Sequence, residues 1–153
     1  MKPLDPSIEQ YRDYVLQARR HLHQHPELAL EEFETTKFLM NELDHMGIPY
    51  IKAHPTGLIA TLKGPNPGPT VALRSDMDAL LIEEKNDKPY TSLTKGKMHA
   101  CGHDGHTAIL LGAAKILKDR QQELSGTVHL LFQPAEEIGH GAKILKETGT
   151  WYK

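Results

Sequence analysis

The chain has 153 residues, of which 39% are hydrophobic and 25% charged, and its formal net charge is −2. This composition is typical of one globular domain and excludes a disordered or fibrous chain. The small negative charge excludes a basic nucleic-acid-binding surface, no apolar run approaches the roughly 20 residues of a membrane span, and one cysteine excludes an internal disulfide framework. The polar N-terminal segment lacks the apolar core of a secretory signal, so we expect a cytoplasmic protein without membrane or nucleic-acid partners.

Two helices are expected in the first third of the chain. Apolar residues recur at helical spacing up to Pro26, and Asp5 can cap this helix while Pro6 suits its first position. Pro26 interrupts the pattern. A second helix is expected over residues 30–46, with Gly47 as its stop signal.

The hydrophobic period then changes to that of strands. Short β-branched, apolar runs at residues 57–62 and 70–74 predict two strands, and the Gly- and Pro-rich connection between them favours a hairpin-like pair. Residues 84–98 have no period, which indicates an exposed loop.

The following segments predict a strand–helix–strand unit. Residues 107–118 are apolar nearly all round, as in a buried helix, and residues 127–133 form a continuous strand pattern. A further helix is expected over residues 141–147. This order of elements predicts the α/β class with a parallel pair of strands.

Chemically active side chains follow the predicted strands or precede the buried helix. They lie in three segments, Ser75–Asp78, His99–His106 and Pro134–Glu137. Because α/β sheets bind ligands beyond the carboxyl ends of their parallel strands, we expect these segments to converge at one edge of the sheet.

The segment HACGHDGH has the composition of a metal site. Cys101 and His103 are two residues apart on a glycine-broken loop, so both can face one centre. Thiolate and imidazole suit zinc, and imidazole with carboxylates also suits manganese, cobalt or nickel. The alternative is a polar loop that caps the helix, with Cys101 packed as a small hydrophobe. The density of Cys, His and Asp favours the metal site.

The acidic residues allow more than one interpretation. Asp76 and Asp78 could be turn caps, could pair with Arg74, or could share a cation. Glu136 and Glu137 could be a solvated pair at a helix start; alternatively, one binds a metal while the other deprotonates a water. The remaining histidines are not expected to be ligands: His21, His23, His25, His45, His54, His129 and His140.

Four motifs in order resemble a known family. RRHLHQHPELALEE, ALRSDMDALLIEE, MHACGHDGHTA and FQPAEEIGHGAK, within residues 12–148, are similar to the di-metal amidohydrolases of the aminoacylase, carboxypeptidase and hippurate hydrolase superfamily. The most similar branch is that of N-acyl-amino-acid, hippurate and indoleacetyl-amino-acid amidohydrolases. The resemblance implies the N-terminal part of a three-layer α/β catalytic domain, with a mixed, mainly parallel sheet flanked by helices, of the phosphorylase/hydrolase-like, zinc-exopeptidase type.

The resemblance also implies roles for individual residues. Cys101, His103 and Glu137 would be metal ligands, Glu136 the general base, and Asp78 a residue that supports the site. Two divalent ions, zinc or manganese with cobalt or nickel as further possibilities, would serve the reaction. It would hydrolyse a small N-acyl amino acid, with an acetyl, benzoyl or similar acyl group, to a carboxylate and a free amino acid.

Asp76 stands where related carboxypeptidases have histidine, as is usual in this branch. Two departures from the family pattern are visible. In the first, Leu81 stands where the branch usually has proline. Family members continue past Lys153 with two further histidine ligands, an inserted dimerisation or lid domain and the remaining strands. We therefore expect residues 1–153 to be the N-terminal portion of the catalytic domain, with weak or no activity alone.

Two other functions remain open at this level. The chain could be a non-catalytic metal-binding or interaction remnant of the family. It could also be a metal-free hydrolase in which Cys101 is the nucleophile beside a histidine.

Overall fold

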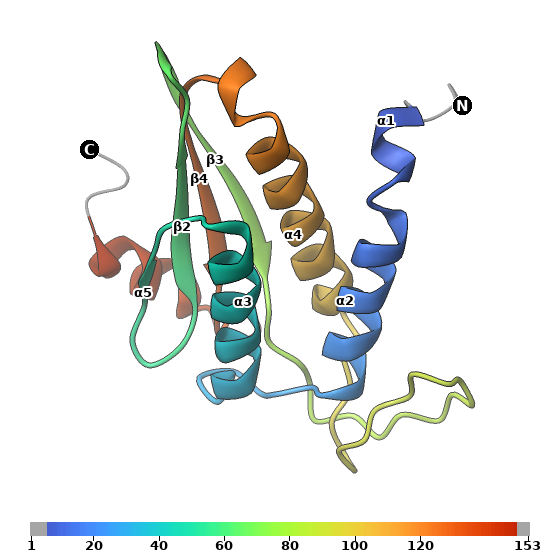
Figure 1. Ribbon diagram of the computed structural model, residues 1–153. Helices are drawn as coiled ribbons and strands as arrows, with labels where there is room; N and C mark the ends of the chain where they lie inside the picture. Colours follow the sequence, from blue (N-terminus) through green and yellow to red (C-terminus); the bar gives the residue numbers. More distant parts are fainter. Residues whose placement is uncertain (1–5, 150–153) are drawn as a thin grey trace.

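The computed structural model describes residues 6–149 and has three layers (Figure 1). Helices α3 (Phe33–Met46) and α4 (His103–Asp119) cover one face of a four-stranded sheet, and α5 (Gly141–Thr148) lies on the other. Helix α2 (Arg12–Gln24) packs against α4 on the side away from the sheet. This is the expected α/β architecture.

The sheet is mixed, in the strand order β1-β2-β4-β3. Strand β4 (Ser125–Gln133) pairs in parallel with β3 (Asn66–Asp76) and antiparallel with β2 (Leu58–Lys63), which pairs antiparallel with β1 (Tyr50–Lys52). The strand–helix–strand unit β3–α4–β4 is confirmed. The predicted hairpin is wrong, because β4 lies between β2 and β3.

The burial of β4 gives the physical reason for that strand order. Its last four residues are buried, with Leu130 and Phe132 fully so, whereas most of β3 is exposed. A continuous apolar strand gains most by an interior position with a neighbour on each side. The strands at residues 57–62 and 70–74 therefore pair with β4 and not with each other.

The helices differ from expectation at their first residues. The first predicted helix is divided into α1 (Pro6–Glu9) and α2, and Asp5 lies outside the described residues. Helix α3 begins three residues after the predicted start, because Leu30 has a left-handed backbone with φ 69° that a helix cannot include. Helix α4 begins at His103, four residues before the predicted start, and β1 was not expected.

Two apolar clusters on opposite faces of the sheet fix its register. In β2 and β4, alternate residues such as Leu58 and Leu130 face α3 and α4. Ile59 and Leu131 face the opposite side, where they meet Leu145 of α5. A slip by one residue would reverse every side chain. The register also pairs Asp76 with Gln133, so β3 and β4 end at the same level.

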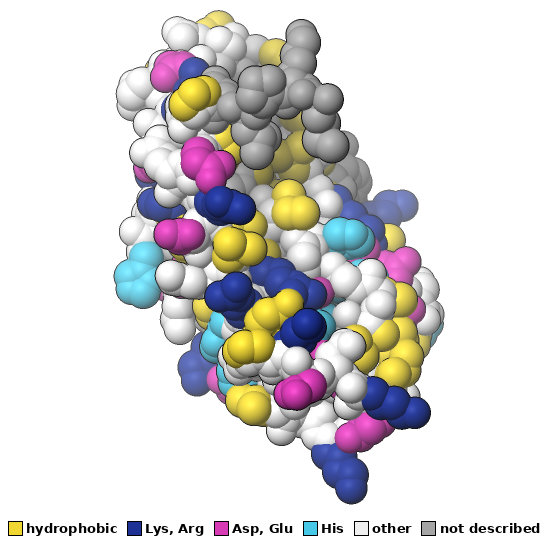
Figure 2. Space-filling model, turned by 90° about the vertical axis from the view of Figure 1, so that its right-hand side faces the viewer, with side chains coloured by type: hydrophobic (Ala, Val, Ile, Leu, Met, Phe, Trp, Pro, Cys, Tyr) yellow, Lys and Arg dark blue, Asp and Glu magenta, His cyan; other side chains and the backbone are white. Residues whose placement is uncertain are grey.

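The surface on the α2 side is chemically mixed. Figure 2 shows small groups of hydrophobic side chains interrupted by Lys, Arg, Asp and Glu. Among residues 6–149, no helix combines the length and the apolar character that crossing a membrane requires.

Candidate metal centre

Three distant segments meet where β3 and β4 end, at the lower edge of the sheet in Figure 1. Asp76 is the last residue of β3, Glu136 and Glu137 follow β4, and His103 is the first residue of α4. The parallel pairing of β3 and β4 brings their carboxyl ends together, as predicted. Side chains separated by up to 61 positions therefore share one site.

The ring of His103 is held in a fixed orientation. Its Nδ1 lies 2.9 Å from the carbonyl oxygen of Asp78 and 3.3 Å from its Oδ1, so Nδ1 carries the proton and donates. The hydrogen bond to Asp78 and the charges of Asp76 and Asp78 raise the pKa of His103, although burial, the largest single effect, lowers it. A histidine held through one nitrogen by a carboxylate is the usual arrangement behind a metal ligand.

The other nitrogen of His103 faces carboxylates across a gap. Its Nε2 lies 3.7 Å from Asp76 Oδ1, 3.8 Å from Glu136 Oε2 and 3.8 Å from Glu137 Oε1. These separations are too long for hydrogen bonds. Lone pairs from one imidazole and three carboxylates are thus directed into a common space.

Two groups of possible ligands share His103. Cys101, His103 and Glu137 form one, and Asp76, His103 and His106 form the other; within each group the ligand atoms lie within 4.8 Å of one another. The first group contains the three residues predicted as ligands. The second was not predicted, although HACGHDGH contains His106 and its spacing of three residues from His103 places both on one face of a helix.

The residues present fit a divalent cation. Glu137 Oε1 is buried without a hydrogen-bond partner among the described residues, which is costly unless an additional group satisfies it. Thiolate, imidazole and carboxylate together are the donor set that zinc accepts. The neighbouring Glu137 carboxylate is the main cause that raises the pKa of Cys101, and burial, Glu136 and Asp78 add to it. A cation would compensate this concentration of negative charge.

Asp76 has two side-chain partners within the protein. Arg74 Nη1 lies 2.8 Å from Asp76 Oδ2, and His106 Nδ1 lies 2.6 Å from Asp76 Oδ1. The pairing with Arg74 was left open by the sequence. Asp76 and Asp78 approach different nitrogens of the His103 ring: Asp76 Oδ1 lies near Nε2, whereas Asp78 faces Nδ1 and also the backbone after β4.

Asp78 holds the turn that carries the two glutamates. Its Oδ2 accepts a hydrogen bond of 3.0 Å from the backbone N–H of Glu137. Burial alone would raise the pKa of Asp78, but hydrogen bonds from His103 and the N–H groups of Glu137 and Glu136 outweigh it and lower the pKa. Asp78 therefore touches two of the three candidate ligands.

The glutamates after β4 differ in exposure. The side chain of Glu136 is 41% exposed and that of Glu137 20% exposed. They lie in a turn that precedes α5, which begins only at Gly141. The two adjacent carboxylates therefore differ in their access to solvent.

Histidines that were not expected as ligands lie elsewhere. His129 on β4 contacts Thr61 Oγ1 at 2.9 Å, and burial lowers its pKa. His45, His54 and His140 are exposed. His23 is buried between α2 and α4, where it contacts Asp104.

Sequence reasoning missed Glu32, a fully buried carboxylate on the far side of the turn after β4. It accepts a hydrogen bond of 2.8 Å from the backbone N–H of Ala135. Within the pattern Glu31-Glu32 at the start of a predicted helix, nothing distinguishes it from a solvated residue.

Known proteins resemble the chain in both sequence and fold. It is 57% identical over 132 residues to N-acetyl-L-cysteine deacetylase of Bacillus subtilis and 52% identical over 142 residues to an IAA-amino acid hydrolase of Arabidopsis thaliana. These matches cover 86% and 92% of the chain but 32% of each relative, so the chain spans about a third of their length.

A solved structure shows the same fold. The YXEP protein of Bacillus subtilis, a dinuclear metal-binding peptidase from the M20 family, superposes with a TM-score of 0.88 at 45% identity. The match covers 92% of this chain and 40% of that one. The family model described as Peptidase family M20/M25/M40 matches residues 72–152, more than half of the chain and the part that holds the candidate ligands, so the chain belongs to this family.

Proposed function

We propose that residues 1–153 form the N-terminal portion of the catalytic domain of a metal-dependent amidohydrolase. Its substrates are small N-acyl amino acids, which it hydrolyses to a carboxylate and a free amino acid. The observation that carries this proposal is the approach of Cys101, His103 and Glu137 to within 4.8 Å at the carboxyl edge of the sheet. The names of the relatives, a deacetylase of N-acetyl-L-cysteine and a hydrolase of IAA-amino acids, support this substrate class.

Cys101, His103 and Glu137 would hold a divalent cation, with zinc best suited to their mixed donor atoms and manganese, cobalt or nickel as alternatives. The chain belongs to a family with a dinuclear member, and Asp76 and His106 offer further donors beside the shared His103. When bound, such ions polarise the scissile carbonyl and make a water acidic enough to lose a proton near neutral pH.

Glu136 is the proposed catalytic base. Its carboxylate is 41% exposed, so water and substrate can reach it. It also lies close to the candidate ligands, with Oε2 3.8 Å from His103 Nε2. It accepts a proton from the attacking water and delivers it to the amide nitrogen as the C–N bond breaks. Asp78 assists by orienting the ring of His103 and the backbone of Glu137.

A chimeric enzyme tests this function. Residues of this chain replace the matching segment of the Bacillus subtilis N-acetyl-L-cysteine deacetylase, and release of free amino acid from N-acetyl amino acids and hippurate is measured with zinc or manganese. We expect metal-dependent turnover, reduced by about 100-fold or more in E136Q because the base is lost. The 153-residue chain alone is expected to turn over slowly or not at all.

Other outcomes identify the alternatives. Metal binding by a folded chimera without hydrolysis would indicate a non-catalytic metal-binding module. Turnover that survives a chelator but is lost in C101S would indicate a thiol hydrolase. The raised pKa of Cys101, caused mainly by Glu137, argues against a thiolate nucleophile.

A further inference from the structure

Glu32 is a buried carboxylate with both oxygens engaged. It precedes α3 and is 0% exposed. Its Oε2 accepts a hydrogen bond of 2.6 Å from Thr56 Oγ1, and its Oε1 accepts one of 2.8 Å from the N–H of Ala135. Burying a carboxylate is costly unless its oxygens are hydrogen-bonded. An apolar side chain in this position could not accept the hydrogen bonds from Thr56 and Ala135.

Ala135 has an unusual backbone conformation. Its φ is 50°, in the left-handed region that costs an L-residue with a Cβ atom roughly 1–2 kcal/mol. Its carbonyl oxygen accepts hydrogen bonds of 3.2 Å from the N–H groups of both His140 and Gly141. The N–H of Ala135 is bonded to Glu32 alone among the described residues, so this carboxylate holds the peptide unit before the Ala135 Cα, while His140 and Gly141 hold the one after it.

The turn at Ala135 determines the direction of the chain that follows. Glu136 and Glu137 are the next two residues, and the N–H of Glu137 reaches Asp78 Oδ2. Two buried carboxylates thus hold the turn. Glu32 binds the N–H of Ala135, just before the two glutamates, and Asp78 binds the N–H of Glu137. Asp78 also touches the site directly, whereas Glu32 does not.

We propose that Glu32 is a positioning residue for the candidate metal centre: by holding Ala135 in its left-handed conformation, it aims Glu136 and Glu137 at the space between His103 and Cys101. The inference rests on the proposed function in that it takes Glu137 as a ligand. It assigns a role to the motif around residue 32, which lies 103 positions before Ala135.

Cobalt titration of the 153-residue chain tests the role. A Cys101 thiolate bound to Co²⁺ produces a charge-transfer absorption in the near ultraviolet, so the apparent affinity is read without catalysis. In E32M, which fills the same space without an acceptor, we expect Co²⁺ affinity to fall about 10- to 100-fold, as for other residues that orient ligands. E32Q keeps an oxygen for Ala135 and should stay close to wild type.

Thr56 provides the matched control. T56V removes the other hydrogen bond to the same carboxylate but leaves the Ala135 bond in place. We expect T56V to lower the melting temperature without a comparable loss of Co²⁺ affinity. An equal loss of affinity in T56V and E32M would mean that Glu32 is only structural, and would overturn the inference.

The remaining outcomes separate the two proposals. If the wild-type chain gives no thiolate–Co²⁺ band, the proposed metal centre fails, and the role of Glu32 fails with it. If wild type binds and a folded E32M binds equally well, only the role of Glu32 fails. Should circular dichroism show that E32M is unfolded, E32D replaces it, because the shorter side chain withdraws the carboxylate from Ala135 but keeps its charge; unchanged affinity in E32D would also overturn the inference.

Discussion

The single cysteine reports directly on the charge of the candidate site. Cys101 is exposed, and the carboxylate of Glu137 is the main cause of its raised pKa. A raised pKa leaves less thiolate near neutral pH, and only the thiolate reacts with alkylating agents. We predict that iodoacetamide labels Cys101 more slowly than a free cysteine at pH 7–8, with a pH midpoint above the ordinary value.

The same labelling experiment distinguishes the effect of the Glu137 carboxylate on Cys101 from the effect of a bound metal. In E137Q the main cause of the shift is removed, so the midpoint should fall and labelling at neutral pH should accelerate. Zn²⁺ should protect Cys101 in wild type and much less in E137Q. Labelling of E137Q that is as slow as in wild type would show that the carboxylate does not control this thiol.

Only part of the site could be predicted from the residues. Cys101, His103 and Glu137 stand in short polar segments beside predicted strand ends, and the shared edge of the sheet is a general consequence of parallel pairing. The bond between Glu32 and Ala135 has no such local sign, because it depends on how α3 packs against a turn far away in the sequence. The pairing of Asp76 with Arg74 likewise depends on the folded backbone at the end of β3 and cannot be told from the local sequence.

At the scale of elements, strand positions were easier to predict than strand neighbours. The apolar runs of β2, β3 and β4 mark each strand in the sequence. Their order depends on which strand gains most from burial on both sides, and this is a property of the whole sheet. Helix α4 began early for a similar reason, since His103 and Asp104 are polar but are buried and paired in the fold.

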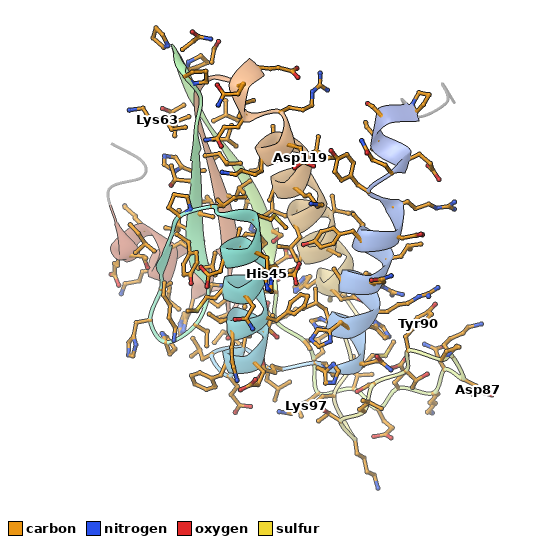
Figure 3. All side chains as sticks on the ribbon, viewed as in Figure 1. His45, Lys63, Asp87, Tyr90, Lys97 and Asp119 are labelled. Atoms are coloured by element: carbon orange, nitrogen blue, oxygen red, sulfur yellow. The ribbon has the colours of Figure 1, made fainter. Side chains whose placement is uncertain are left out.

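The loop at residues 84–98 has no helix or strand, as predicted, yet one of its residues is firmly anchored. The Glu84 side chain is 3% exposed; it lies 3.1 Å from His23 Nε2 and accepts a hydrogen bond of 2.7 Å from the Ser92 N–H. Tyr90 lies beneath Arg19 and Arg20 of α2, beside the lower end of that helix in Figure 3. The loop is therefore attached to α2.

Glu84 is the residue whose removal should release the loop. E84A leaves the donors of His23 and Ser92 without their buried acceptor, which we expect to cost about 3 kcal/mol of unfolding free energy. Amide hydrogen exchange over residues 84–98 should accelerate more than elsewhere. E83A is the control, because Glu83 is exposed although it also bonds the loop at Gly96. Equal effects of E83A and E84A would contradict the anchor.

The same anchor has a defined pH dependence. Burial raises the pKa of Glu84, but hydrogen bonds from Ser92, His23 and Asn86 outweigh it and leave the pKa below its ordinary value. A carboxylate with a lowered pKa stabilises the fold above its unfolded-state pKa, and this contribution is lost as the pH falls through the folded-state value. In urea unfolding, wild type should exceed E84Q in stability at neutral pH, and the difference should shrink below about pH 4.5. A difference in unfolding free energy that does not change with pH would show that the charge of Glu84 is not the source of the stabilisation.

At the scale of the whole molecule, the candidate centre brings together the start of α4 and the turn after β4. Cys101 and His103 precede or begin α4, and Glu137 lies in the turn between β4 and α5. A cation bound by all three would connect the two layers of helices across the edge of the sheet. Because unfolding separates these ligands, binding to the folded state must raise the stability of the entire chain.

Metal addition should therefore raise the melting temperature, and a chelator should reverse the change. At a free metal concentration of 100 times Kd the gain is about 2.7 kcal/mol, or roughly 5–10 °C for a chain of this size. The wild-type chain, C101S and E137Q are compared by thermal unfolding with Zn²⁺ and with a chelator. The shift should be largely lost in both variants, since each removes one of three ligands, while K143A, which alters an exposed lysine of α5, should keep it. An equal shift in all four proteins would place the bound metal elsewhere. A shift in melting temperature that is lost in E137Q but kept in C101S would mean that the carboxylates and His103 hold the ion without the Cys101 thiol.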